Sequence, residues 1–246
     1  MAACLAVASA ASAQSSEERA AARSVVAKRS DAVIVVLATV KLRINVGGRE
    51  QAADQAMQMN GTILDATGLT VFSLQQIQPD EAMTRMYSRQ MPSGGGKIEV
   101  TSEPSDIKMH LADGRELPAK LVLRDTDLDL AFIRPSEPLS APLPFIDAPS
   151  GKPSLLDTLT LVRRTNEATG WIAGASFANV ELVIDKPRTY YQVAILGGGN
   201  SGSPLFDMAG RFVGVLLMRD TGARVPGLAI LPADDIREVA KQAVIK

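Results

Sequence analysis

The sequence predicts an all-β fold, either a β-sandwich or a pair of β-barrels, with a C-terminal helix. Three observations support this class. Apolar runs are short and often β-branched, turn signals separate them at regular spacing, and one amphipathic helical pattern comes last. The 246 residues are 46% hydrophobic and 22% charged, which suits one or two domains with a full core.

The N-terminal residues 1–13, MAACLAVASAASA, are small and apolar and end in an Ala-x-Ala pattern. This pattern is typical of a secretory signal peptide, so we expect an exported protein, periplasmic or secreted. The basic segment that usually precedes the apolar run is missing, and an Ala-rich terminus is the alternative. Residues 14–30 are rich in Ala, Arg and Glu and predict an N-terminal arm, helical or loose.

Residues 31–138 predict the first set of strands. Residues 32–37 form a β-branched run, 41–46 alternate polar and apolar, and Gly47-Gly48 suits a turn after them. Further strands are expected around the turn signals at 65–68 and 113–114, in residues 62–74, 107–110 and 117–123, and a last one at 128–133.

Residues 79–106 differ in composition from the strands around them. They contain three prolines, a Gly94-Gly95-Gly96 run and scattered charge. We interpret this segment as an exposed insertion, partly helical around Glu81 to Ser88 and then flexible. Four prolines between 135 and 144 mark a crossover to the second half, residues 139–246.

The second half repeats the pattern of short strands and ends in a helix. Residues 233–244 place their apolar side chains on one helical face. Strands are expected near 155–162, 170–176, 180–184, 190–195, 204–206, 212–218 and 228–231.

Bulk properties exclude several function classes. The net charge of −1 gives no reason to expect nucleic-acid binding, and no apolar run outside the N-terminus approaches the ~20 residues that span a bilayer. The single Cys4 cannot form an internal disulfide, and His110 is the only histidine. Five methionines between 57 and 91 have irregular spacing and no supporting histidine, so we expect no metal and no cofactor.

One motif carries chemistry, the stretch Gly-Asn-Ser-Gly-Ser-Pro-Leu at 199–205. Glycines on both sides of Ser201 allow a tight turn that directs backbone amides inward. The amides of Gly199 and Ser201 can then form an oxyanion hole while the Ser201 hydroxyl attacks a carbonyl. A Gly-x-Ser-Gly stretch is also common in ordinary turns, so a loop that is only a scaffold is the alternative.

The flanks of this motif resemble the active-serine region of Deg/HtrA-type members of the trypsin superfamily. Residues 191–193 lead into the loop, 210–215 form the hairpin after it, and 226–232 resemble the strand that lines the primary specificity pocket. In the first half, residues 61–68, 111–120 and 125–133 resemble the family's hairpins and its catalytic-aspartate strand. The resemblance covers roughly residues 31–246.

The resemblance implies two six-stranded antiparallel β-barrels of the trypsin-like type with a C-terminal helix. The first barrel is expected in residues 31–138 and the second in 139–246. It also implies that Ser201 occupies the nucleophile position and Asp129 the aspartate position. Substrate would contact Gly227, Leu228 and Ala229.

The chain departs from the family at the histidine. Counting from Gly68, the histidine position falls on Gln75, or on Gln76 if the register slips by one. A glutamine amide cannot take up the serine proton near neutral pH, and His110 lies on a different strand. We hypothesise that Gln75 holds the geometry instead, with its side chain bridging Asp129 and Ser201. Ser203 also replaces the family's usual glycine.

The favoured interpretation is therefore a pseudoprotease that binds an extended peptide or a partner protein without cleaving it. One alternative is an active endopeptidase that uses Ser201 with a non-histidine base. Another is a scaffold whose 79–106 insertion docks a partner. The sequence does not define the oligomeric state.

Overall fold

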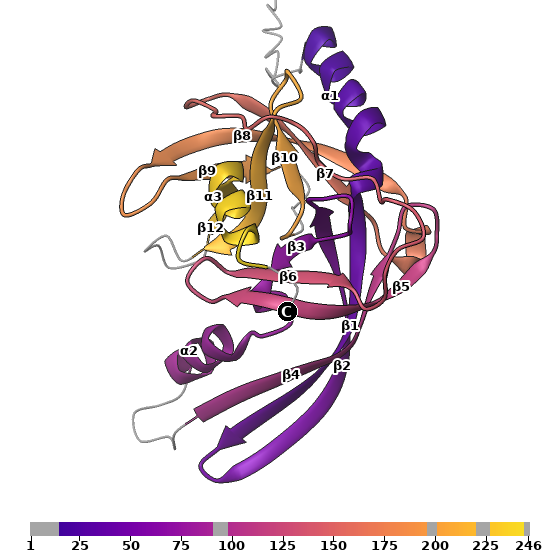
Figure 1. Cartoon of the computed structure of the whole chain (residues 1–246). Coiled ribbons are helices and arrows are strands. Elements are labelled where there is room, and N and C mark those ends of the chain that lie inside the picture. Colours follow the sequence, from indigo (N-terminus) through magenta and orange to yellow (C-terminus); the bar gives the residue numbers. More distant parts are fainter. Residues whose placement is uncertain (1–14, 91–97, 196–200, 220–226, 244–246) are drawn as a thin grey trace, which may run out of the picture.

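The computed structural model describes residues 15–90, 98–195, 201–219 and 227–243. It confirms the predicted all-β class: two closed six-stranded antiparallel barrels, followed by the C-terminal helix α3 (Ala233–Ala240) (Figure 1). The predicted signal peptide, residues 1–13, lies outside the described residues. None of the helices within the described ranges is long and apolar enough to cross a membrane.

The first barrel has the strand order β1-β2-β3-β6-β5-β4. The turns predicted at 47–48, 65–68 and 113–114 connect consecutive antiparallel strands, as expected. The strands are β1 (Val33–Val46), β2 (Arg49–Ile63), β3 (Thr70–Ser73), β4 (Ile98–His110), β5 (Glu116–Asp125) and β6 (Leu130–Pro135).

The second barrel has the strand order β10-β11-β12-β9-β8-β7. The two strands expected at 170–176 and 180–184 are one strand, because β8 pairs with β7 and β9 in turn along its length. The strands are β7 (Thr158–Arg164), β8 (Ala173–Ile184), β9 (Tyr190–Ile195), β10 (Pro204–Phe206), β11 (Phe212–Arg219) and β12 (Gly227–Pro232).

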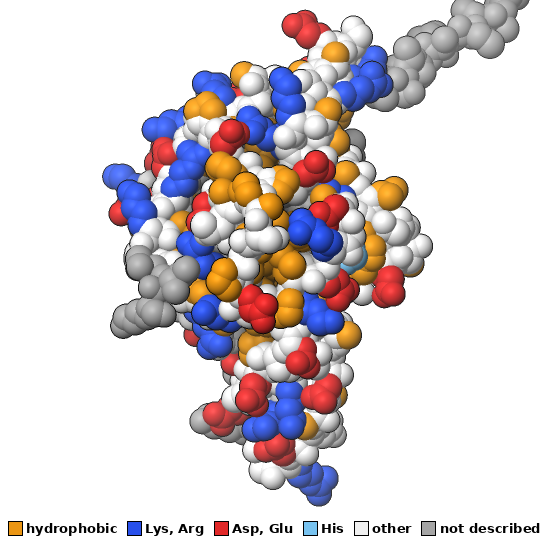
Figure 2. Space-filling model, turned by 45° about the vertical axis from the view of Figure 1, so that its right-hand side comes forward, with side chains coloured by type: hydrophobic (Ala, Val, Ile, Leu, Met, Phe, Trp, Pro, Cys, Tyr) orange, Lys and Arg blue, Asp and Glu red, His pale blue; other side chains and the backbone are white. Residues whose placement is uncertain are grey.

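Three strands of the first barrel continue past it as an extension, which we call the arm (residues 39–56 and 98–105). Figures 1 and 2 show it projecting from the body, with acidic and basic side chains interspersed. Residues 98–106, expected to be flexible, are part of β4, and residues 98–105 pair with β1. The predicted helix is present as α2 (Asp80–Gln90), whose Met83 and Tyr87 pack against the arm residues Leu42, Ile98 and Val100.

A hydrophobic cluster joins the two barrels, separate from the core inside each barrel. It includes Phe132 from β6 and Phe212 from β11, both fully buried. The predicted N-terminal helix is α1 (Ser16–Arg29), which begins at a Ser15–Glu18 capping box and inserts Val25 into this cluster. The position of one barrel on the other is thus set by packing rather than by a shared sheet.

One buried cation also holds the barrels together. Arg164, at the end of β7, is 6% exposed, and its guanidinium donates to the carbonyls of Ser30, Val33 and Trp171. Its backbone N–H and carbonyl bond the side chain of Asn60 in β2. Strands of both barrels therefore meet at Arg164, close to the predicted active-site edge.

Candidate active site

Asp129 lies just before β6 and is 2% exposed. Its backbone has a φ of +60°, a conformation that Asp adopts more readily than most residues. The Ser73 hydroxyl donates to Oδ2 at 2.7 Å, and the Gln75 backbone N–H donates to Oδ1, also at 2.7 Å. These two bonds fix the carboxylate at the end of β3, where the sequence placed the aspartate of a triad.

Burial raises the pKa of Asp129 to about 6, because the charged form loses its hydration. The bonds from Gln75 and Ser73 act in the opposite direction, as does the positive charge of Arg219. Near pH 6 the buried carboxyl group is thus divided between its neutral and charged forms. In this site no imidazole supplies a balancing charge.

The turn after Ser201 packs directly on the first barrel. Gly202 has a φ of +89°, and a Cβ there would lie 2.2 Å from the Asn60 carbonyl oxygen. The Gly202 carbonyl accepts from Thr62 Oγ1 at 2.9 Å, and the Gly202 N–H donates to the Leu216 carbonyl at 2.7 Å. Only glycine fits this close approach, which holds the turn between β11 and the strands that lead to Gln75.

The predicted Gln75 bridge is not formed. Among the described residues, which include both Gln75 and Ser201, the Gln75 side-chain amide makes no hydrogen bond to Asp129 or to Ser201. The backbone N–H of Gln75 and the hydroxyl of Ser73 already bond Asp129, one on each carboxylate oxygen. The buried acid is therefore satisfied without the glutamine side chain. Gly199, the other predicted oxyanion-hole residue, lies outside the described residues.

His110 makes its contacts outside this site, as the sequence suggested. It lies at the end of β4 opposite Glu116, with its Nδ1 3.7 Å from a Glu116 oxygen. Its ring centroid is 4.6 Å from that of Trp171. Val35 pairs with both Asn60 and His110, so His110 lies two strand spacings, about 10 Å, from Asn60, whose carbonyl faces Gly202. Within the described residues the His110 ring makes no hydrogen bond to Asp129 or Ser201, so the chain's only imidazole does not complete a triad there.

Ser203, which stands where the family usually has glycine, is fully buried, and its hydroxyl has no hydrogen-bond partner among the described residues. Its carbonyl accepts from the Leu216 N–H, so the backbone still joins β11 here. No group of three or more His, Cys, Asp or Glu in the described ranges is arranged to hold a metal ion.

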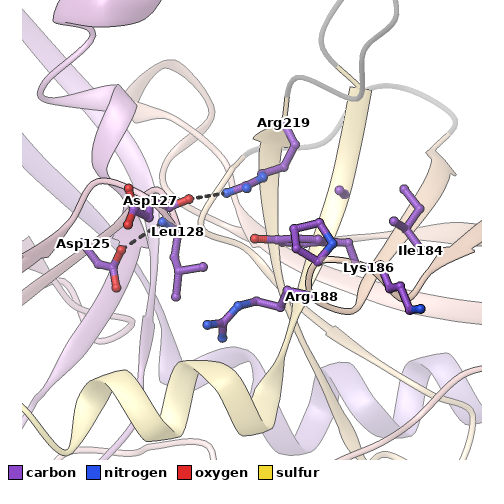
Figure 3. Close-up of a pocket in the computed structure, with 10 residues that line it drawn as sticks. Asp125, Asp127, Leu128, Ile184, Lys186, Arg188 and Arg219 are labelled. Carbon is purple, nitrogen blue, oxygen red and sulfur yellow. Dashed lines mark hydrogen bonds between the residues drawn. The ribbon is translucent and has the colours of Figure 1, made fainter.

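Two pockets lie between the barrels beside this site. The smaller, about 320 Å³, contains Gln75 and Asp129, and α2 lines another side of it. The larger, about 550 Å³, lies between the loop before Asp129 and the turn from β8 to β9 (Figure 3). Asp127 and Arg219 line both pockets. We call the two pockets together the groove.

The groove runs beside a free strand edge. Residues 214–219 of β11 pair with β12 on one side, whereas β10 covers the other side only as far as Val215. After Leu216 bonds Gly202 and Ser203, residues 217–219 have no described strand on that side. Of the predicted substrate residues, Gly227 and Leu228 belong to β12 and pair with the edge of β11 opposite the groove. Ala229 lines the larger pocket.

The comparison with protein families agrees with this architecture. The family model of the trypsin-like peptidase domain matches residues 91–215, just over half of the chain. The chain therefore belongs to the family of trypsin-like peptidase domains. The matched segment contains Asp129 and Ser201 and begins after Gln75. No curated protein matches the chain.

Sequence reasoning missed two residues of the site, Ser73 and Arg219. Ser73 lies within the four residues compared with the family's histidine motif, but only the tertiary contact reveals its bond to Asp129. Arg219 follows an apolar strand and reaches the other barrel, bonding the Asp127 carbonyl 92 residues away. Neither contact has a signal in the local pattern.

Proposed function

We propose that this protein is a pseudoprotease: it binds an extended peptide or a protein segment in the groove and does not cleave it. The observation that carries the proposal is the position of the only histidine, on β4 beside Glu116 and Trp171. With no histidine bonded to Asp129 or Ser201 among the described residues, Ser201 has no imidazole to accept its proton. In serine proteases such a loss lowers turnover by roughly 10⁴-fold or more.

Binding would occur by strand addition on the free edge of β11. Residues 217–219 offer backbone groups that pair with no described strand on the side of the Ser201 turn, and the two pockets of the groove would receive side chains of the peptide. Met218, 40% exposed at the smaller pocket, supplies apolar surface for such a contact. A catalytic cleft that has lost its base retains these binding features.

The narrower assignment, a Deg/HtrA-like protein exported to the periplasm or secreted, belongs to the same proposal. It is supported by the ordered motifs at 61–68, 111–120, 125–133 and 199–205 and by the signal-like residues 1–13. A glutamine in place of the catalytic histidine is likewise supported by the register at Gln75, whose backbone bonds Asp129.

The test is labelling by a fluorophosphonate, which reacts with an activated serine. We expect no labelling of the folded wild type and none of Ser201→Ala. We expect Gln75→His to gain Ser201-dependent labelling, because an imidazole there would lie beside Asp129; a positioned base contributes on the order of 10²-fold or more. Wild-type labelling that Ser201→Ala abolishes would overturn the proposal in favour of an active endopeptidase with another base.

The docking of a partner by residues 79–106 needs a different test from deletion. Residues 98–106 are part of β4, so removing the whole segment would remove most of that strand and its pairing with β1 in the arm. Substitutions on the exposed face of α2, such as Met86→Ser, leave the barrels intact. Loss of partner binding with retained peptide binding would identify α2 as the docking site.

A further inference from the structure

Arg219 crosses the groove from one barrel to the other. It ends β11, and its guanidinium donates to the Asp127 carbonyl in the first barrel at 3.0 Å. The same guanidinium lies 4.5 Å from the centroid of the Tyr190 ring. Figure 3 shows the side chain extended toward Asp127, and Arg219 lines both pockets.

Two of the charged side chains that line the larger pocket with Arg219 bond other groups. The Asp125 carboxylate accepts from the Leu128 N–H at 2.9 Å, and Arg188 pairs with Asp235 at 2.9 Å. Figure 3 shows the Arg188 and Lys186 side chains directed away from Arg219. Within the described residues Arg219 forms no ion pair, and its acceptor is a neutral carbonyl. It is a partly buried cation that faces the groove with hydrogen-bonding capacity to spare.

We propose that Arg219 selects a carboxylate on the bound peptide, supplied by an Asp or Glu side chain or by a C-terminus. The inference rests on the proposed peptide binding and specifies which peptides the groove takes. A strand added beside residues 217–219 passes next to Arg219, so that a carboxylate on it enters the larger pocket.

Arg219 forms stronger hydrogen bonds with a carboxylate than with the Asp127 carbonyl that it now bonds. Hydrogen bonds from a guanidinium to a carboxylate are roughly twice as strong as bonds between neutral groups, and they are often bidentate. The carboxylate therefore binds the Arg219 N–H groups that the Asp127 carbonyl leaves free, or replaces that carbonyl as the acceptor. The Tyr190 ring remains beneath the guanidinium and keeps it oriented.

Asp127 opposes this binding, because its side chain lines both pockets and repels a second carboxylate. Asp129 contributes less repulsion when it is protonated. Asp127→Asn should therefore strengthen binding of acidic peptides by a few-fold and leave neutral peptides unaffected. The opposite signs expected for substitutions at Asp127 and Arg219 distinguish charge selection from general damage to the groove.

The experiment uses immobilised full-length protein and synthetic libraries of short random peptides, one set amidated and one with a free C-terminus. Retained peptides are sequenced by mass spectrometry for the wild type, for Arg219→Glu and for the control Lys152→Glu, which makes the same kind of charge change at an exposed position outside the groove. We expect about tenfold enrichment of acidic peptides on the wild type and Lys152→Glu. Arg219→Glu should lose this enrichment and favour Lys or Arg.

Enrichment within the amidated set identifies side-chain carboxylates as the ligand, and enrichment confined to the free-acid set identifies the C-terminus. Peptides retained without an acidic excess, or with the same excess on Arg219→Glu, would overturn the selection by Arg219 while peptide binding stands. Failure of the folded wild type to retain any peptide would overturn peptide binding as well.

Discussion

At the scale of single residues, Asp129, which occupies the predicted aspartate position, is a buried carboxyl group with no imidazole bonded to it in the described structure. Its carboxylate is enclosed, bonded by Ser73 and Gln75, and has a pKa raised to about 6 by burial. In the unfolded chain the pKa has its ordinary value of 3.8. The folded state therefore binds the proton more tightly than the unfolded state, and stability falls as the pH rises between these values.

We predict that Asp129→Asn removes this pH dependence. Relative to the variant, the wild type should lose up to about 3 kcal/mol of unfolding free energy between pH 4 and pH 7. Chemical denaturation of both proteins across this range measures the difference. A wild type that gains stability over the variant as the pH rises would contradict the expected sign.

Ser203 offers a second prediction at this scale. Its hydroxyl is buried and unpaired in the described structure, which costs free energy relative to an apolar group. Ser203→Ala should therefore stabilise the protein by about 1 kcal/mol, measured as a shift in the denaturation midpoint. The control Ser201→Ala, at a partly exposed position, should change the midpoint little. Destabilisation by Ser203→Ala would mean that the hydroxyl has a partner.

At the scale of elements, the arm is the part of the first barrel with its own small cluster of side chains. Leu42 is 6% exposed and packs with Ile98, Val100 and α2 rather than with the barrel core. Leu42→Ala should therefore cost about 2–3 kcal/mol locally. Hydrogen exchange should show faster amide exchange in residues 39–56 and 98–105, with β6 and β11 unchanged. Uniformly faster exchange in all strands would show that the arm and barrels unfold together.

The element boundaries that the sequence did not predict have physical reasons. Residues 49–56 of β2 are exposed on both faces, so they lack the alternation that indicates a strand. In β4, Pro104 and scattered charge resemble a loop, yet an edge strand tolerates proline because its outer N–H needs no partner. The hairpins at 65–68 and 113–114 were predictable, since their turn residues act locally.

The candidate site also contains features that the sequence predicted and features that it did not. The strand that follows Asp129 was predictable because it lies in a contiguous motif, whereas the nucleophile role of Ser201 stays a prediction. The Gln75 bridge was predicted wrongly, because the choice between a side chain and a backbone N–H depends on how β3 meets Asp129. The role of Arg219 depends on a contact between barrels, which no local pattern records.

At the scale of the whole molecule, Arg164 links the two barrels and the segment after α1. Replacing it with methionine would leave the carbonyls of Ser30, Val33 and Trp171 without their donor. We predict that Arg164→Met costs about 3 kcal/mol or more in unfolding free energy. The neighbouring Arg163→Met is the matched control and should cost far less. Equal losses in the two variants, measured by chemical denaturation, would show that the Arg164 bonds contribute little.

The stacked pair of His110 and Trp171 has a practical consequence. The chain contains one tryptophan and one histidine, and their rings lie 4.6 Å apart although one belongs to β4 and the other to the loop before β8. Tryptophan emission depends on the groups around the ring, so Trp171 is an intrinsic fluorescence probe of the contact between the two halves. A titration followed by the fluorescence of Trp171 therefore reports on this contact between the two halves, without any attached dye.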